Sequence, residues 1–157
     1  MTVWLIPARY DVRMKQKRRY RKATKGGGLA GAWPDPTSTP DDVATRASYV
    51  GSAEHKDHPL HGSYAIDVGL RSDASRCDPK LSRTEAERAL RKAIRRRCVS
   101  ADFDNGFPRY VWARIQLRPH AARLTNSYTG QYKGWPVDET ELPKDDEHRL
   151  DAESWGV

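Results

Sequence analysis

The chain has 157 residues, of which 37% are hydrophobic and 31% charged, and its formal net charge is +7. That length predicts a single domain with a lean hydrophobic core. No apolar run is long enough to span a bilayer, and the first residues lack the basic start of a secretory signal, so we expect no membrane partner. Two cysteines make no disulfide framework, which favours a reduced, cytoplasmic protein over the alternative of a secreted toxin segment.

The charge is distributed unevenly along the chain. Residues 8–28 contain nine basic residues and one acidic residue, whereas residues 138–157 contain eight acidic residues and two basic ones. We expect residues 1–28 to form a short strand and a basic arm that becomes ordered on a phosphate backbone. A solvated segment that only aids solubility is the alternative. The arm residues predicted to bind nucleic acid are Arg18, Arg19, Arg21 and Lys22.

The positions of proline, glycine and charged residues predict how the rest of the chain is divided into a linker, a core and a tail. Residues 29–45 are rich in proline and glycine and are predicted to form a linker loop. Residues 46–137 are predicted to form the folded core. Residues 138–157 are predicted to form an acidic tail.

Three of the five histidines, His55, His58 and His61, recur at a spacing of three residues. They could ligate a metal, transfer protons or lie in a polar surface loop. Pro59 and Gly62 interrupt a regular helix, and no CxxC or HExxH motif accompanies the histidines. No phosphate-loop or dinucleotide motif occurs elsewhere. We therefore predict neither a metal nor a cofactor, and a metal-dependent hydrolase stays a lesser hypothesis.

The clearest predicted element is a helix within residues 81–100. Ser82 and Glu85 have the spacing of a capping box, and apolar residues from Ala86 to Cys98 fall on one face. The opposite face carries a stripe of cations that we predict to bind nucleic acid. A solvated outer face is the alternative. The stripe consists of Arg88, Arg91, Lys92 and Arg95.

Three strand-like segments follow a loop at residues 101–108, namely residues 109–117, 120–128 and 129–138. They predict a small single α+β domain in which the amphipathic basic helix packs on one face of an antiparallel β-meander. This order of helix and meander is similar to that of small bacterial ribonuclease toxins of the barnase and RelE type. The resemblance is architectural and covers roughly the second half of the chain.

A metal-independent ribonuclease needs few groups, because RNA carries its own nucleophile in the 2′-hydroxyl. An acid, a base and cations around the phosphate suffice. His55 is predicted to be the acid or base, with Glu54 as its alternate. The catalytic cations are predicted to be Arg71, Arg109 and Arg114. Tyr132 and Lys133, close to a glycine-containing turn, are predicted to contact nucleic acid. The alternatives are that Arg71 pairs with Asp73, that Arg114 stacks on aromatic side chains, and that Tyr132 is a core residue.

Together these patterns predict an RNA-directed protein, and the hypothesis for its activity is a small metal-independent endoribonuclease of toxin type. The alternative is a non-catalytic nucleic-acid-binding or adaptor subunit of a larger assembly. RNA is favoured over DNA as the partner, and an acidic protein partner stays open.

Overall fold

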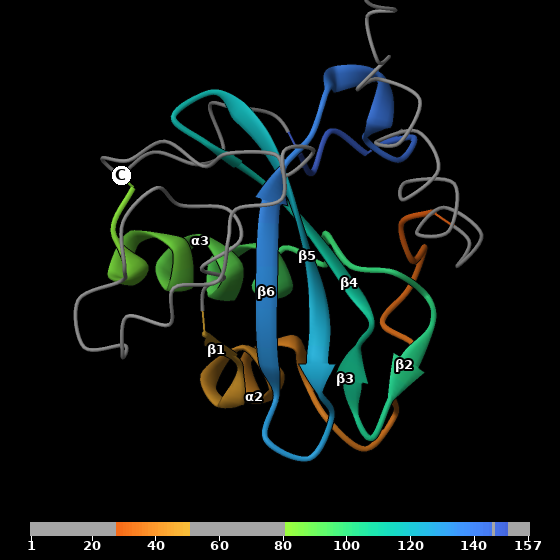
Figure 1. Cartoon of the computed structure of the whole chain (residues 1–157). Helices are drawn as coiled ribbons and strands as arrows, with labels where there is room; N and C mark the ends of the chain where they lie inside the picture. Colours follow the sequence, from red (N-terminus) through yellow and green to blue (C-terminus); the bar gives the residue numbers. More distant parts are fainter. Residues whose placement is uncertain (1–27, 51–80, 146, 151–157) are drawn as a thin grey trace, which may run out of the picture.

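The computed structural model describes residues 28–50, 81–145 and 147–150. Its centre is a four-stranded sheet in the order β1–β6–β5–β4 (Figure 1). The last three strands in the chain are antiparallel neighbours, whereas β1 pairs with β6 in parallel. The four strands are β1 (Ser48–Tyr49), β4 (Tyr110–Ile115), β5 (Arg118–Asn126) and β6 (Gln131–Pro136).

Strands β4, β5 and β6 form where apolar and polar residues alternate, and tight turns join them into a meander. Gln116 and Leu117 join β4 to β5, and both have positive φ, as a two-residue hairpin turn of type I′ requires. Gly130, just before β6, also has positive φ, and the Phe107 ring leaves no space for a Cβ atom there. Isolated bridges from Val99 to Val111 and from Leu29 to Ser100 extend the pairing beyond β4. The predicted meander is confirmed.

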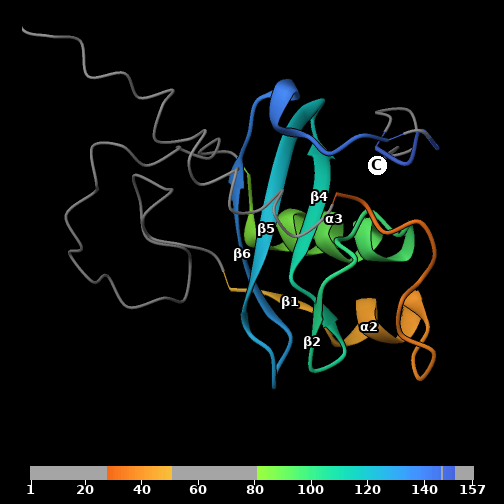
Figure 2. The ribbon, with the colours of Figure 1, turned by 90° about the vertical axis from the view of Figure 1, so that its right-hand side faces the viewer.

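Helix α3 (Arg83–Arg95) begins at the predicted capping box. The Ser82 side chain accepts from the Glu85 N–H, and the Glu85 carboxylate accepts from the Ser82 N–H. Its buried residues are the predicted apolar face, and Cys98 just beyond the helix is also buried. Figure 2 shows α3 and the shorter helix α2 (Pro40–Arg46) on the same side of the sheet. A single α+β domain with the helix packed on one sheet face is therefore confirmed.

Side chains of α3 bind the backbone of β1 directly. The Glu87 carboxylate accepts from the Tyr49 N–H at 3.1 Å, and Arg83 Nε donates to the Tyr49 carbonyl at 2.9 Å. Arg91 Nε donates to the Ala47 carbonyl at 3.0 Å and its guanidinium pairs with Glu87. These three residues lie one helical turn apart, so one stripe of α3 satisfies the outer edge of β1 as a neighbouring strand would.

Two segments predicted to be loops contain regular structure. Within the expected linker at residues 29–45, Thr39 caps α2 and Pro40 occupies its first position. Within the expected loop at residues 101–108, β2 (Phe103–Asp104) and β3 (Phe107–Pro108) form a small hairpin. The turn residues Asn105 and Gly106 both have positive φ. An Asn-Gly pair is the standard sequence signal for such a turn.

The C-terminal residues 138–145 and 147–150 pack on the core, unlike the acidic tail expected for residues 138–157. A short 3-10 helix, η2 (Glu139–Glu141), follows β6. The Arg149 guanidinium donates to the carbonyls of Ala30 and Arg97, at 2.8 and 2.9 Å. Leu150 is buried. Backbone carbonyls of the core therefore hold this segment through Arg149.

We predict that Glu87→Ala lowers the free energy of unfolding by about 1–3 kcal/mol, because it leaves the Tyr49 N–H without its acceptor and releases Arg91. Urea denaturation followed by circular dichroism measures the change. Arg88→Ala, on the next residue of the same helix, is the control and should change stability by less than about 0.5 kcal/mol. Equal effects of the two substitutions would contradict the assigned role of Glu87.

Candidate nucleic-acid interface

The basic stripe predicted on α3 is partly engaged within the protein. Arg91 binds Glu87 and the Ala47 carbonyl, as described above. Arg95 Nε pairs with Asp41 of α2 at 2.6 Å. Lys92 is half-buried and is also engaged by an interaction within the protein. Arg88 is exposed and has no ion pair within the described residues. Two of the four cations therefore stabilise the packing of α3 against α2 and β1.

Of the two arginines predicted to surround a phosphate, Arg109 lies just before β4 and Arg114 lies near its end. Arg109 pairs with Asp102 at 3.2 Å and with Asp104 at 3.7 Å. Arg114 forms a two-pronged ion pair with Glu139 and donates to the Leu150 carbonyl at 2.7 Å. They are five positions apart along an extended chain, which separates their Cα atoms by roughly 17 Å. The structure thus uses each arginine in a separate structural contact.

Several predicted site residues lie outside the described residues. They are Arg18, Arg19, Arg21 and Lys22 of the arm, the residues Glu54 and His55, the further histidines His58 and His61, and Arg71. Within residues 28–50, 81–145 and 147–150, no group of three His, Cys, Asp or Glu side chains could hold a metal ion.

Tyr132 and Lys133 are neighbours on β6 and point to opposite faces of the sheet. Tyr132 is fully buried, and its hydroxyl donates to the Pro108 carbonyl at 2.7 Å. Burial raises the pKa of this phenol well above its usual value, so the hydroxyl stays a donor. Tyr132 is therefore a core residue that fastens β3 to β6. Lys133 is exposed on the face opposite α3.

A cluster of aromatic and cationic side chains lies on this outer sheet face. Pairing across the strands aligns Tyr110 of β4 with Arg123 of β5, and Arg123 with Lys133 of β6. Trp135 follows on the same side of β6, two residues after Lys133. Arg123 and Lys133 are exposed, whereas Tyr110 and Trp135 are half-buried. We name these four residues the meander face.

The pairing of Arg123 with Lys133 is electrostatically unfavourable in the protein alone. Residues directly opposite in an antiparallel pair have Cβ atoms about 5 Å apart, and like charges there are destabilising. Among the described residues, neither cation has a carboxylate partner, in contrast to Arg91, Arg95, Arg109 and Arg114. An anion between the two side chains would remove the repulsion. The meander face is therefore the best candidate here for binding phosphate.

Sequence reasoning identifies Lys133 but misses Arg123. The segment HAARLTN is predicted to be a strand, yet the face on which Arg123 lies depends on its register with β4 and β6. The alternation of Ala122 and Leu124 with Arg123 is the signal that could have found it.

Comparisons with protein-family models, with curated proteins and with solved structures found no match for this chain. The helices in the described part of the chain are too short or too polar to cross a membrane.

The ion pair of Arg114 with Glu139 gives a pH-dependent prediction. Hydrogen bonding to Arg114 holds the pKa of Glu139 below its usual value of 4.5. A lowered folded-state pKa means that the pair contributes its full stability above pH 4.5 and loses it as pH falls through the folded-state pKa. Because Glu139 is largely exposed, we expect Glu139→Gln to cost at most about 1 kcal/mol at pH 7.

Urea denaturation of the parent and of Glu139→Gln, repeated from pH 7 down to pH 3, measures this difference. The two proteins should converge in stability at the acid end. Asp104→Asn, which affects only the longer 3.7 Å pair with Arg109, is the control and should show a smaller difference throughout. A difference between parent and Glu139→Gln that persists at pH 3 would contradict the ionic origin of the effect.

Proposed function

We propose that this protein binds single-stranded nucleic acid, with RNA favoured, and that the meander face is a contact surface for the strand. The observation that carries the proposal is the like-charged pair Arg123–Lys133, exposed and without carboxylate partners in the described residues. Two cations at this spacing suit adjacent oxygens of a phosphate backbone.

The aromatic residues beside the cations favour a single strand over a duplex. Tyr110 and Trp135 flank the two cations on one sheet face, and Tyr110 stacks on Trp112 with ring centroids 6.2 Å apart. Single-stranded ligands bind by the combination of a cationic surface with aromatic rings on which bases stack. Unstacked bases of RNA loops and ends are the usual targets of such surfaces, which favours RNA.

The predicted cations of the arm and of α3 have a supporting role in this proposal. Arg88 is exposed, but α3 covers the opposite side of the sheet from the meander face (Figure 2). A strand on the meander face would therefore reach Arg88 only around an edge of the sheet. Binding is proposed ahead of cleavage, because Arg109 and Arg114 are held by carboxylates and the acid–base candidate His55 lies outside the described residues.

The test is fluorescence anisotropy with a labelled single-stranded RNA, measured for the parent and for Arg123→Gln combined with Lys133→Gln. We expect affinity to fall by about tenfold for each charge-assisted hydrogen bond to phosphate that the substitutions remove. The slope of log K against log salt should become shallower by about 1.4, since single strands contribute about 0.7 per phosphate neutralised. Single-stranded DNA and duplex RNA of matched sequence should bind the parent more weakly.

The matched control is Arg118→Gln combined with Lys144→Gln, which removes the same charge from exposed positions outside the meander face. It should retain most of the affinity and the salt slope. Equal weakening by the two double variants would mean that net charge alone attracts the RNA. Absence of binding by the parent at low salt would remove the proposed function.

A further inference from the structure

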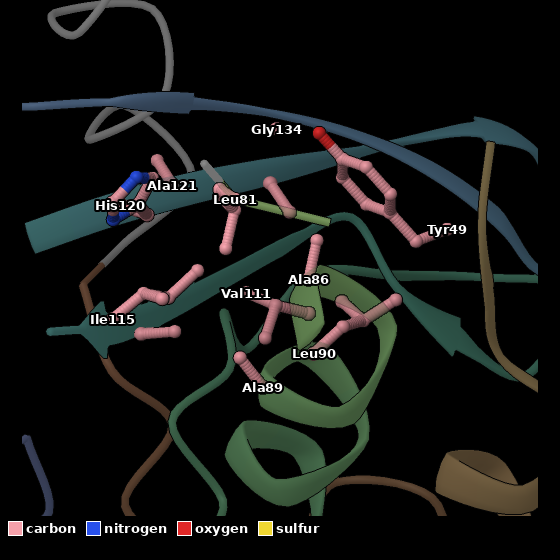
Figure 3. Close-up of a pocket in the computed structure, with 12 residues that line it drawn as sticks. Tyr49, Leu81, Ala86, Ala89, Leu90, Val111, Ile115, His120, Ala121 and Gly134 are labelled. Atoms are coloured by element: carbon pink, nitrogen blue, oxygen red, sulfur yellow. The ribbon is translucent and has the colours of Figure 1, made fainter. Parts of the chain in front are cut away.

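The meander carries cations on a surface that has no acidic residues. Strands β4, β5 and β6 contain neither aspartate nor glutamate. Figure 3 shows Val111, Ile115 and His120 on the inner face of the sheet, which α3 covers. The cavity there is about 30 Å³, which is room for about one water molecule, so a nucleotide does not fit. A nucleotide that binds the sheet therefore meets the outer face, where Arg123 and Lys133 lie.

The register of the strands makes Arg123 and Lys133 a closely spaced pair. The Val137 N–H donates to the Pro119 carbonyl at 3.0 Å, and hydrogen-bonded pairs of β5 with β6 recur at every second position from there. Arg123 and Lys133 are one of these pairs, with Cα atoms about 5.5 Å apart. A single phosphate between the two side chains can therefore accept hydrogen bonds from the arginine fork and from the lysine ammonium.

The charge of a phosphate distinguishes the end of a nucleic-acid strand from its interior. An internal phosphodiester carries one negative charge. A terminal phosphomonoester carries about −1.5 to −2 charges at pH 7 and offers three acceptor oxygens. One phosphate can therefore neutralise two facing cations only when it is a monoester. The pair Arg123–Lys133 thus suits the phosphorylated end of a strand better than its interior.

The aromatic residues beside the pair favour a nucleotide over a phosphate alone. The Tyr110 carbonyl accepts from the Ser100 N–H on the side away from β5, so Tyr110 and Arg123 are a non-hydrogen-bonded pair with Cα atoms only about 4.5 Å apart. Trp135 lies two residues beyond Lys133, roughly 7 Å along β6. A base attached to the bound phosphate can stack on either ring, whereas a phosphorylated protein side chain carries no base.

We propose that the meander face binds the phosphorylated end of a single-stranded RNA, with the terminal phosphomonoester between Arg123 and Lys133 and the terminal base against Tyr110 or Trp135. This specificity rests on the proposed function, and it names the part of the strand that is recognised. The 5′ end and the 3′ end can carry the same phosphomonoester, and the experiment distinguishes them.

The experiment compares four short RNAs of one sequence, each labelled on an internal base, by fluorescence anisotropy. They carry a 5′-phosphate, a 3′-phosphate, a 2′,3′-cyclic phosphate or hydroxyl groups at both ends. We expect the RNA with the 5′- or the 3′-phosphate to bind about tenfold more tightly than the hydroxyl-ended RNA, because it adds a charge-assisted contact. The cyclic phosphate is a diester with a single charge, so its RNA should gain much less.

Arg123→Gln combined with Lys133→Gln should remove the preference for the phosphorylated end. Both side chains are exposed and repel each other, so this double variant should have a urea midpoint no lower than that of the parent. Arg118→Gln combined with Lys144→Gln removes the same charge from exposed positions elsewhere and should keep the preference. If the first double variant does not fold, the difference between the monoester and the cyclic phosphate in the parent still decides.

Equal affinity of the parent for all four RNAs would overturn the proposed specificity. If the variant with Arg123 and Lys133 replaced then binds all four more weakly, the proposed function itself stands. A preference that persists in that variant would also overturn the specificity. A phosphoserine peptide of matched net charge that binds as tightly as the phosphorylated RNA would overturn it as well, since no base would then be recognised. Absence of binding to any RNA would remove both proposals.

Discussion

The arrangement of this domain depends on the hydrogen bonds between one stripe of α3 and the backbone of β1. A two-residue strand beside a meander gains few ladder bonds of its own, and its outer edge would be left for water or another chain. Arg83, Glu87 and Arg91 satisfy that edge from the helix. The same contacts hold α3 alongside the sheet, on the face that is buried.

The use of arginine inside this domain explains why a high net charge is a poor guide to a binding surface. Arg91, Arg95, Arg114 and Arg149 each bind acceptors of the protein itself, either carboxylates or backbone carbonyls. Each of these arginines also joins separate parts of the fold, as Arg91 does by donating to the Ala47 carbonyl and Arg149 by donating to the Ala30 carbonyl. The cations that indicate a binding surface are those that lie beside another cation with no carboxylate near. Their mutual repulsion destabilises the protein alone, and a bound anion would relieve it.

Local signals in the sequence were sufficient for much of the fold. The capping box at Ser82 placed the start of α3, and alternation from Tyr110 onward placed β4 and its faces. Two further local signals were present in segments predicted to be loops because they are rich in turn-forming residues. One is Thr39 followed by Pro40, which begins α2, and the other is the Asn-Gly pair of the β2–β3 turn. Proline and aspartate favour loops on average, but at a helix start they favour the helix.

The candidate site was less predictable because it depends on pairing between distant segments. No sequence spacing could show that Arg114 meets Glu139, or that Arg123 faces Lys133 across two strands. Tyr132 illustrates the same limit: its residue type suits a base platform or a core equally well, and only the register of β6 decides for the core. These contacts join segments that are far apart in the chain, so no local pattern in the sequence reveals them.

Cys98 shows how closely the C-terminal segment is fitted. Its thiol donates to the Arg149 carbonyl at 3.3 Å, and burial raises its pKa to about 12. A protonated, enclosed sulfur is a poor target for alkylating reagents and oxidants. Iodoacetamide would therefore react with Cys98 only in molecules in which residues 147–150 have moved away from the core. If the other cysteine of the chain, Cys77, is replaced by serine, the alkylation rate measures how often that local opening occurs.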